Sequence, residues 1–286
     1  NSFFSKNMWD IMYKKGYFIK KFFYTLISYV KRYLFLFRIN QNDTVYLFLW
    51  GTPFFDTLFE KLLIRKNITL IYDIEDNIFV IKKNNINPLT YYFKSNKKYL
   101  ILIKSAKYII TSSKELEKIC ERFSNKNNCF FIPPTIFNLS DINSLNYLIK
   151  DKITIGWTGT FSSVSYLRIV ENVIKDLAKK YNINFIVISN LKYENKNFIV
   201  ENIEWNKKNE IKDLRKIDIG IYPVNDEDWS YGKSGLKALQ YMGLGIPTVA
   251  SDILTTRDII KNNHDGILVK NDYDSWFYAL ERLILD

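Results

Sequence analysis

The sequence predicts an α/β protein with two domains in series, each built on a parallel β-sheet. Apolar segments of strand length alternate with amphipathic segments of helix length along most of the 286 residues. The alternation stops at Pro133 and Pro134 and restarts after a polar stretch. Alternating strands and helices form parallel sheets with crossover helices, so we expect one sheet on each side of that stretch. The predicted domains are 1–134 and 151–286, joined by a linker at 135–150.

The first domain begins with a basic amphipathic segment and continues with strands and helices in turn. Residues 18–38 interleave aromatic and aliphatic side chains with five Lys or Arg residues, which predicts an amphipathic helix. The helix after the first strand has a proline at its start, a favoured position. We expect strands at 44–50, 68–74, 108–113 and 129–135 and helices at 53–66 and 114–123.

The second domain opens with a strand that ends in the glycine turn GWTGT, at 156–160. The helix predicted after this turn places Tyr166, Val170, Val173 and Leu177 on one face. The remaining elements follow in regular order. We expect strands at 152–160, 182–190, 218–224, 246–251 and 267–270, and further helices at 210–217, from 233, at 255–263 and at 273–284.

Positive charge is concentrated in the first domain. Residues 1–134 carry 22 Lys and Arg against 10 Asp and Glu, whereas 135–286 carry 19 against 20. This asymmetry predicts an anionic partner, either nucleic acid or an anionic membrane leaflet. No nucleic-acid-binding module is recognisable, so we expect no nucleic-acid partner. The uncharged part of the 18–38 helix is too short to span a bilayer. The helix could instead lie in the membrane–water interface, or it could pack its apolar face on the core of the domain.

Histidine and cysteine usage restricts the chemistry. His264 is the only histidine, which excludes a Ser-His-Asp triad combined with a histidine metal site. Cys120 and Cys129 match no metal-binding spacing and indicate no disulfide framework, so a reducing cytoplasm is expected. Asp226 and Asp228 lie in an acidic loop that could hold a divalent ion, but such loops are usually solvated. We predict no metal and no cofactor.

A phosphate-binding site is predicted at 233–235, where Lys-Ser-Gly lies at the N-terminus of a helix. The first four amides of a helix lack intrahelical acceptors, and the helix dipole is positive at that end. A lysine there is unfavourable unless an anion accepts the amides and pairs with the ammonium group. The alternative is a lysine that extends into solvent. With two such domains in tandem, the ligand is expected in the cleft between them.

The segment KSGLKALQYMGLGIPTVAS at 233–251 resembles the nucleotide-sugar domain of glycosyltransferase family 4, the group 1 glycosyltransferases. The flanking DIGIYPV, DGILV and SWFYALERLI and the GWTGT turn agree with it, and LIYDIEDNIF at 70–79 resembles the N-terminal domain of the family. The resemblance covers 44–286 and implies the GT-B fold, two Rossmann-like domains facing a cleft. Against the family pattern, we expect both chain ends to be incomplete.

This resemblance implies transfer of a sugar from a UDP- or GDP-sugar to a hydroxyl of a glycan or lipid-linked acceptor, with retention and without a metal. Such an enzyme would act in cell-surface polysaccharide or glycolipid synthesis, in the cytoplasm or peripherally on the inner membrane face. The residues implied in catalysis are Asp73, Asp76 and Lys233. Those implied in donor binding are Gly159, Thr160, Lys233, Ser234, Gly235, Leu236, Lys237 and Gln240.

Two departures from the family concern carboxylates. Family members carry two glutamates eight positions apart around the donor helix, and Gly232 and Gln240 stand at these positions here. An amide can still hydrogen-bond a ribose diol. The family's basic pair after the first glycine turn is also missing, which leaves Lys233 and Lys237 to neutralise the diphosphate. A non-catalytic GT-B protein that binds a nucleotide-sugar or a partner enzyme is therefore the alternative function.

Overall fold

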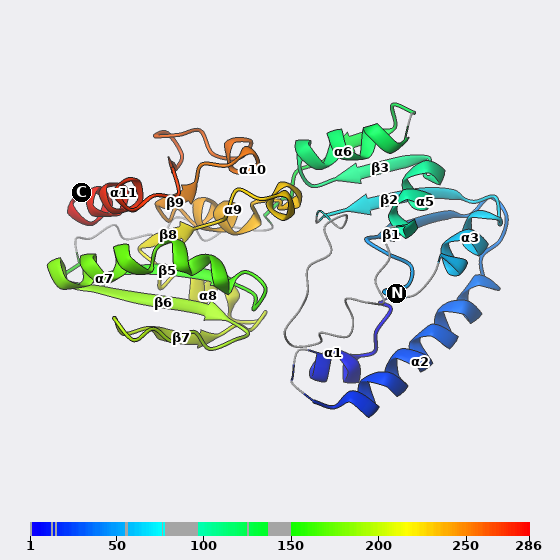
Figure 1. The fold of residues 1–286 in the computed structure, drawn as a ribbon, viewed down its shortest axis with the longest axis horizontal. Helices are drawn as coiled ribbons and strands as arrows, with labels where there is room; N and C mark the ends of the chain where they lie inside the picture. The colour runs from blue at the N-terminus through cyan, green and yellow to red at the C-terminus, as the bar shows by residue number, and fades with distance from the viewer. Residues whose placement is uncertain are drawn as a thin grey trace. The chain divides into compact units, whose positions relative to one another are not determined.

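The computed structural model describes residues 2–12, 14, 16–54, 57–75, 77, 97–124, 126–136 and 150–286. The chain divides into two compact units, Asn1–Pro133 with Tyr231–Lys233, and Pro134–Ser230 with Ser234–Asp286. Each unit holds one sheet whose strands are all parallel, which confirms the predicted α/β fold class (Figure 1). Most of the predicted linker, 137–149, lies outside the described residues.

The sheet of the first unit has four strands in the order β1-β2-β3-β4. Burial alternates along β2, where Leu70, Tyr72 and Ile74 point into the core. Helices α5 and α6 cover this face with Leu102, Ile103 and Leu116. The strands are β1 (Thr44–Phe48), β2 (Thr69–Ile74), β3 (Tyr108–Thr111) and β4 (Cys129–Phe131), and the helices that follow β1 are α3 (Leu58–Ile64), α5 (Lys97–Ser105) and α6 (Lys114–Ser124).

Two helices precede this sheet, α1 (Lys6–Met12) and α2 (Phe18–Leu36). The end of α2 packs on α3, where Leu36, Ile39, Phe59 and Leu63 form a small buried cluster. The predicted amphipathic helix therefore forms, whereas α1 and α5 were not predicted.

The sheet of the second unit has the order β10-β9-β8-β5-β6-β7. Numbered within this unit from its first strand, that order is the 3-2-1-4-5-6 arrangement of dinucleotide-binding domains. The strands are β5 (Ile153–Gly159), β6 (Ile183–Ser189), β7 (Glu201–Glu204), β8 (Ile219–Tyr222), β9 (Thr248–Ser251) and β10 (Ile267–Val269). The helical segments are η2 (Val164–Ile169), α7 (Glu171–Lys180), α8 (Glu210–Leu214), η3 (Asp228–Gly232), α9 (Leu236–Gly243), α10 (Leu254–Arg257) and α11 (Tyr273–Leu285).

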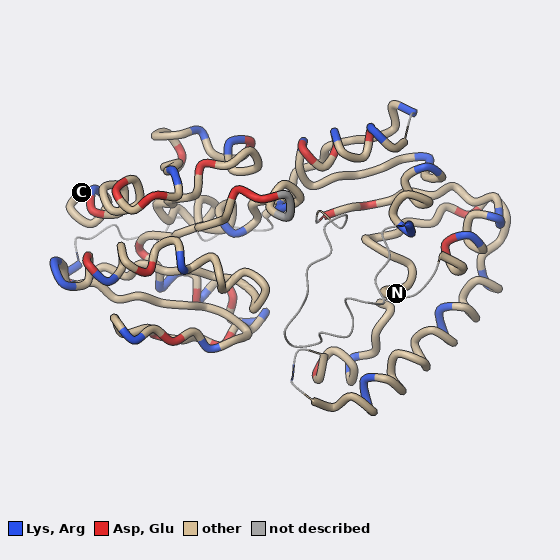
Figure 2. Tube along the Cα trace, in the orientation of Figure 1, with Lys and Arg blue, Asp and Glu red and all other residues tan. Residues whose placement is uncertain are grey.

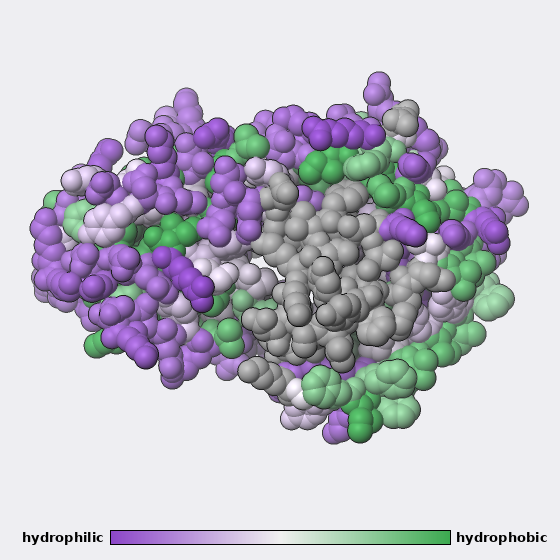
Figure 3. Space-filling model, viewed as in Figure 1, coloured by the Kyte–Doolittle hydropathy of each residue, from purple (hydrophilic) through white to green (hydrophobic). Residues whose placement is uncertain are grey.

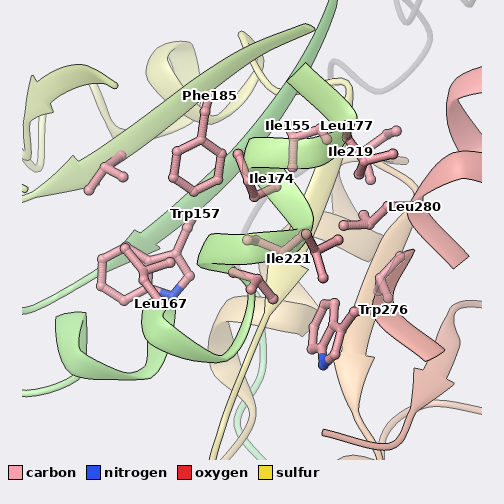
Figure 4. Close-up of a cluster of buried hydrophobic side chains, with 14 of the residues drawn as sticks. Ile155, Trp157, Leu167, Ile174, Leu177, Phe185, Ile219, Ile221, Trp276 and Leu280 are labelled. Atoms are coloured by element: carbon pink, nitrogen blue, oxygen red, sulfur yellow. The ribbon is translucent and has the colours of Figure 1, made fainter. Parts of the chain in front are cut away.

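Helices cover both faces of this second sheet. On one face, Trp157 and Phe185 of the strands pack with Ile174 of α7 and Trp276 of α11 (Figure 4). On the other face, α8 and α9 pack against β6, with Ile186, Ile188, Leu214 and Tyr241 in the core. Because both faces are covered, the central strands β8 and β9 are buried along their whole length.

Several further elements differ from the predictions. The helix predicted from 233 begins at Leu236, and the helix predicted at 255–263 is the short α10, Leu254–Arg257. The helix predicted at 53–66 begins only at Leu58. The single helix predicted after the glycine turn is divided into the 3₁₀ segment η2 and the α-helix α7, with Val170 (φ −110°, ψ −2°) between them. Strand β7 was missed because its sequence, Glu-Asn-Ile-Glu, is mostly polar, and as an edge strand it has a partner on one side only.

Candidate functional site

The strand order of the second unit places its topological switch point at the carboxyl ends of β5 and β8. From β5 the chain continues toward β6 and β7, and from β8 it continues in the opposite direction toward β9 and β10. Loops on the two sides of such a switch point lead away from each other, and ligands of open parallel sheets bind there. The GWTGT motif forms the end of β5, and the chain leaves this strand after Gly159; residues 223–235 follow β8.

The glycine turn lies directly beside a cation from α9. Lys237 Nζ donates a hydrogen bond to Ser163 Oγ at 2.9 Å and lies 4.9 Å from the centroid of the Trp157 ring. A Cβ atom on Gly159 would lie 2.6 Å from Lys237 Nζ and 2.3 Å from the Trp157 ring. Glycine is therefore required at 159 for the ammonium group to occupy this position.

Hydroxyl groups surround the same turn. Ser163 Oγ donates to the Thr160 carbonyl at 3.1 Å, and the Thr160 and Ser162 hydroxyls are 2.8 Å apart. The Phe161 amide donates to Asn190 Oδ1 at 2.9 Å, which ties the turn to the end of β6. The turn thus presents hydroxyls and a lysine side chain at the switch point.

The amino end of α9 enters the same region. Gly235 is the N-cap residue, with φ +68°, and no side chain caps the helix. Uncapped amides at a helix start bind anions. The left-handed backbone favours glycine, and a Cβ at 235 would also lie 2.2 Å from Ile259 Cδ1. Ser234 is buried, whereas Lys233 is partly exposed and belongs to the segment grouped with the first unit.

Tyr241 of α9 fixes the helix to the switch strands. Strand β5 pairs with β8 only at Ile155 and Gly156. Farther along β5, the Thr158 amide donates to the Tyr241 hydroxyl at 2.7 Å instead. The Tyr241 ring is fully buried and packs on Gly220, where a Cβ would lie 2.6 Å from it. Burial holds the pKa of the Tyr241 phenol well above its usual value, so the hydroxyl stays protonated.

The loop after β8 is held by side chains that no sequence motif identifies. Ser251 Oγ accepts from the Val224 amide at 2.8 Å, and Asn271 Nδ2 donates to the Val224 carbonyl at 2.8 Å. The Ser251 hydroxyl in turn donates a hydrogen bond to Asn271 Oδ1 at 2.6 Å. Both polar backbone groups of Val224 are therefore satisfied by residues at the ends of neighbouring strands. Only the fold brings these positions together.

Gln240, expected at the ribose, lies beside an acidic side chain. Its amide Nε2 donates to Glu210 Oε1 at 3.2 Å. The same oxygen accepts from Trp205 Nε1 at 3.1 Å. Glu210 therefore supplies a carboxylate next to position 240, where the family pattern leads one to expect a glutamate. It was not among the predicted site residues, because it lies 30 residues earlier on a different helix.

The predicted catalytic carboxylates belong to the first unit. Asp73 lies within β2 and accepts a hydrogen bond from the Tyr46 hydroxyl of the neighbouring strand β1. It caps no helix. Partial burial, and then the hydrogen bond to Asp73, raise the pKa of Tyr46 to about 12. Asp76 lies outside the described residues.

In the described part of the chain, no three His, Cys, Asp or Glu side chains lie close enough together to hold a metal ion. No helix of that part combines the length and apolar character of a membrane span.

Comparisons with known proteins agree with the observed fold. Residues 152–286 match the family model described as "Glycosyl transferases group 1". No curated protein matches the sequence significantly. Among solved structures, HepE from Anabaena, crystallised with UDP and glucose, matches with a TM-score of 0.58 at 12% identity, over 80% of this chain and 66% of HepE.

Two further solved structures are similar. The catalytic domain of starch synthase IV from Arabidopsis thaliana, bound to ADP and acarbose, matches with a TM-score of 0.60 at 13% identity, over 90% of this chain and 68% of that domain. TarM, from S. aureus, matches with a TM-score of 0.62 at 13% identity, over 88% of this chain and 50% of TarM. The chain thus spans half of TarM and 66% of HepE. The C-terminal domain is thus similar to the group 1 glycosyltransferases, and the chain has the GT-B fold.

Proposed function

We propose that this protein is a retaining, metal-independent glycosyltransferase. It transfers a sugar from a UDP- or GDP-sugar to a hydroxyl of a glycan or lipid-linked acceptor, in the synthesis of a cell-surface polysaccharide or glycolipid. The family of the C-terminal domain supports the reaction class. The structures with UDP or ADP bound in similar proteins support a nucleotide diphosphate as the leaving group.

The observation that carries the proposal is the position of Lys237. Its ammonium group, the glycine turn and the uncapped start of α9 meet at the switch point of the sheet. In the reaction, the bond between the anomeric carbon and a diphosphate oxygen breaks, and negative charge grows on the diphosphate. A lysine and helix amides aimed at that charge stabilise the transition state more than the ground state.

We assign the donor residues accordingly. The backbone at Gly159 and Thr160 approaches the diphosphate, and the Ser234, Gly235 and Leu236 amides bind it. Lys237 and Lys233 neutralise it, and Gln240 bonds the ribose hydroxyls. On the acceptor side, we propose that Asp73 or Asp76 orients the acceptor hydroxyl. The protein would work in the cytoplasm, with its basic N-terminal half on the inner face of the membrane that holds a lipid-linked acceptor.

The second candidate is a non-catalytic nucleotide-sugar-binding protein. Gly232 and Gln240 favour it, since neither supplies the carboxylate that the family pattern places there. Both candidates require a nucleotide site in the C-terminal domain. They differ in whether the bound donor turns over.

The test combines ligand-induced thermal stabilisation with donor hydrolysis. UDP, GDP and ADP are added separately, and at least one should raise the melting temperature by mass action. Lys237→Gln should remove most of this shift. Lys192→Gln is the matched control, because Lys192 is an exposed lysine of the same unit that pairs with Glu194 at 2.7 Å.

Each result decides between the candidates. Slow release of free nucleotide from a nucleotide-sugar supports the enzyme. Binding without release, across a donor panel, supports the non-catalytic protein. If no nucleotide stabilises the protein, or if Lys237→Gln responds like the control, the assigned diphosphate site is wrong.

A further inference from the structure

Helix α2 exposes its apolar side and buries part of its polar side. It spans Phe18–Leu36, 19 residues, or about 28 Å at 1.5 Å per residue. Its outer face consists of large apolar side chains, each of which is about half exposed or more. These residues are Phe18, Ile19, Phe22, Phe23, Leu26, Ile27, Val30 and Leu34, followed by Phe37 at the C-cap.

The exposure of this outer face is high for apolar side chains. Ile19 is 75% exposed, Phe22 65%, Leu26 50% and Phe37 82%. At 100° per residue, Ile19, Leu26, Val30 and Phe37 lie within about 40° of one another around the helix axis. A continuous apolar surface of this kind marks an interaction site in a soluble protein. Figure 3 shows hydrophobic side chains gathered over α2, at the lower right of the view.

The opposite side of α2 faces the protein and contains polar groups. Lys21 and Ser28 are buried. Lys21 Nζ donates to the Lys14 carbonyl at 2.7 Å, and Ser28 Oγ donates to the Tyr24 carbonyl at 2.8 Å. Near its C-terminal end, the helix is attached through Leu36, which packs on α3. The apolar outer face is therefore not the face by which α2 joins its own unit.

Positive charge borders the outer face. Lys20, Lys31 and Arg38 are exposed and fall at nearly the same angle around the helix, along one margin of the apolar surface. Between Asp10 and Asp43 the sequence contains seven Lys or Arg residues and no acidic residue. Figure 2 shows Lys and Arg, without Asp or Glu, along α2.

We propose that α2 is an in-plane membrane anchor that binds an anionic bilayer. Its outer face enters the boundary between headgroups and acyl chains, and Lys20, Lys31 and Arg38 extend along one side to the lipid phosphates. Long basic side chains place their charge at the headgroups while their methylene groups remain in the apolar layer. This proposal rests on the membrane association proposed above and assigns it to one helix face.

Charge favours a bilayer over a second copy of this chain. Two outer faces packed together would bring two sets of basic residues close to one another, with no acidic residue of this segment to pair with them. An anionic leaflet instead attracts each basic residue by about 1 kcal/mol, which is about fivefold in binding.

The test is sedimentation of the purified protein with lipid vesicles, without donor or acceptor. Vesicles of phosphatidylcholine alone are compared with vesicles of phosphatidylcholine and phosphatidylglycerol. We expect binding to the anionic vesicles only, weakened by added salt. Phe22→Ser combined with Leu26→Ser should weaken binding at least tenfold, and Lys20→Gln with Lys31→Gln about 25-fold, from about fivefold for each residue.

The matched controls are Ile199→Ser and Tyr278→Ser, exposed apolar residues of the C-terminal unit. They should bind vesicles like the unchanged protein, and circular dichroism should show all variants folded. Equal binding to both vesicle types, or no effect of the α2 substitutions, would overturn the proposal. So would a dimer in light scattering that the Phe22 and Leu26 substitutions convert to a monomer. Because the assay contains no nucleotide, its outcome is independent of glycosyl transfer.

Discussion

Tyr241→Phe tests whether α9 is held to the switch strands by one buried hydrogen bond. The substitution keeps the ring on Gly220 and removes only the hydroxyl that accepts from Thr158 N at 2.7 Å. The Thr158 amide is then buried without a partner, which costs about 1–3 kcal/mol. For a domain of this size, about 4 °C of melting temperature corresponds to 1 kcal/mol, so a loss of 2 kcal/mol predicts a decrease of about 8 °C.

Removal of this hydrogen bond should also weaken nucleotide binding at the proposed donor site. Thr158 lies next to Gly159 in β5, and Tyr241 lies one helical turn after Lys237 in α9. Loosening their contact increases the freedom of the two segments that we propose to bind the diphosphate. The nucleotide-induced increase in melting temperature should therefore be smaller in Tyr241→Phe than in the unchanged protein.

Tyr273→Phe is the control, because the Tyr273 hydroxyl bonds to Asp176 at 3.1 Å on the surface. Removing an exposed hydrogen bond should change stability by about 0.5 kcal/mol or less. Differential scanning fluorimetry, with and without nucleotide, measures both effects. If Tyr241→Phe and Tyr273→Phe have the same melting temperature, the buried hydrogen bond does not stabilise the domain and the prediction is wrong.

Three further outcomes are expected. Gly235→Ala should lower the melting temperature, because position 235 has φ +68° and the added Cβ would clash with Ile259 Cδ1. Adding Ile259→Val, which removes the Cδ1 atom, should recover part of the lost stability. Asn271→Ala removes the donor to the Val224 carbonyl and should cost about 1–3 kcal/mol in urea unfolding, whereas an effect below 0.5 kcal/mol would contradict the loop anchor. Burial raises the pKa of Tyr99 to about 12, above its usual value near 10. The stabilisation from this group is therefore complete below pH 10 and lost as the pH rises toward 12, and Tyr99→Phe should reduce that loss in urea unfolding at each pH.

The strand pattern was predictable because both sheets bury continuous or alternating apolar segments. Strands β5, β6 and β8 were placed within one or two residues of their observed ends. Short apolar segments between glycine and proline signals predict buried strands well. Strand β7 was not predictable in this way, since an edge strand with the sequence Glu-Asn-Ile-Glu is defined by its pairing with β6 and not by apolar content.

The site was only partly predictable, because some of its residues act through partners that are distant in sequence. Gly159 and Lys237 could be selected from local patterns, although 78 positions separate them. The Val224 anchor needs Ser251 and Asn271, and neither side chain differs in kind from many others in the sequence. Such residues become visible only when β8, β9 and β10 are placed side by side.

The structure also distinguishes the two lysines near the start of α9, Lys233 and Lys237. The sequence analysis favoured Lys233 as the main diphosphate ligand, because it stands at the start of the predicted helix. In the structure, Lys237 is the lysine whose ammonium group is held at the glycine turn, by Ser163 and over the Trp157 ring. Its side chain is thus placed before any ligand arrives, which lowers the entropy lost on binding. For this reason Lys237→Gln, rather than a change at 233, is the sharper test of the diphosphate site.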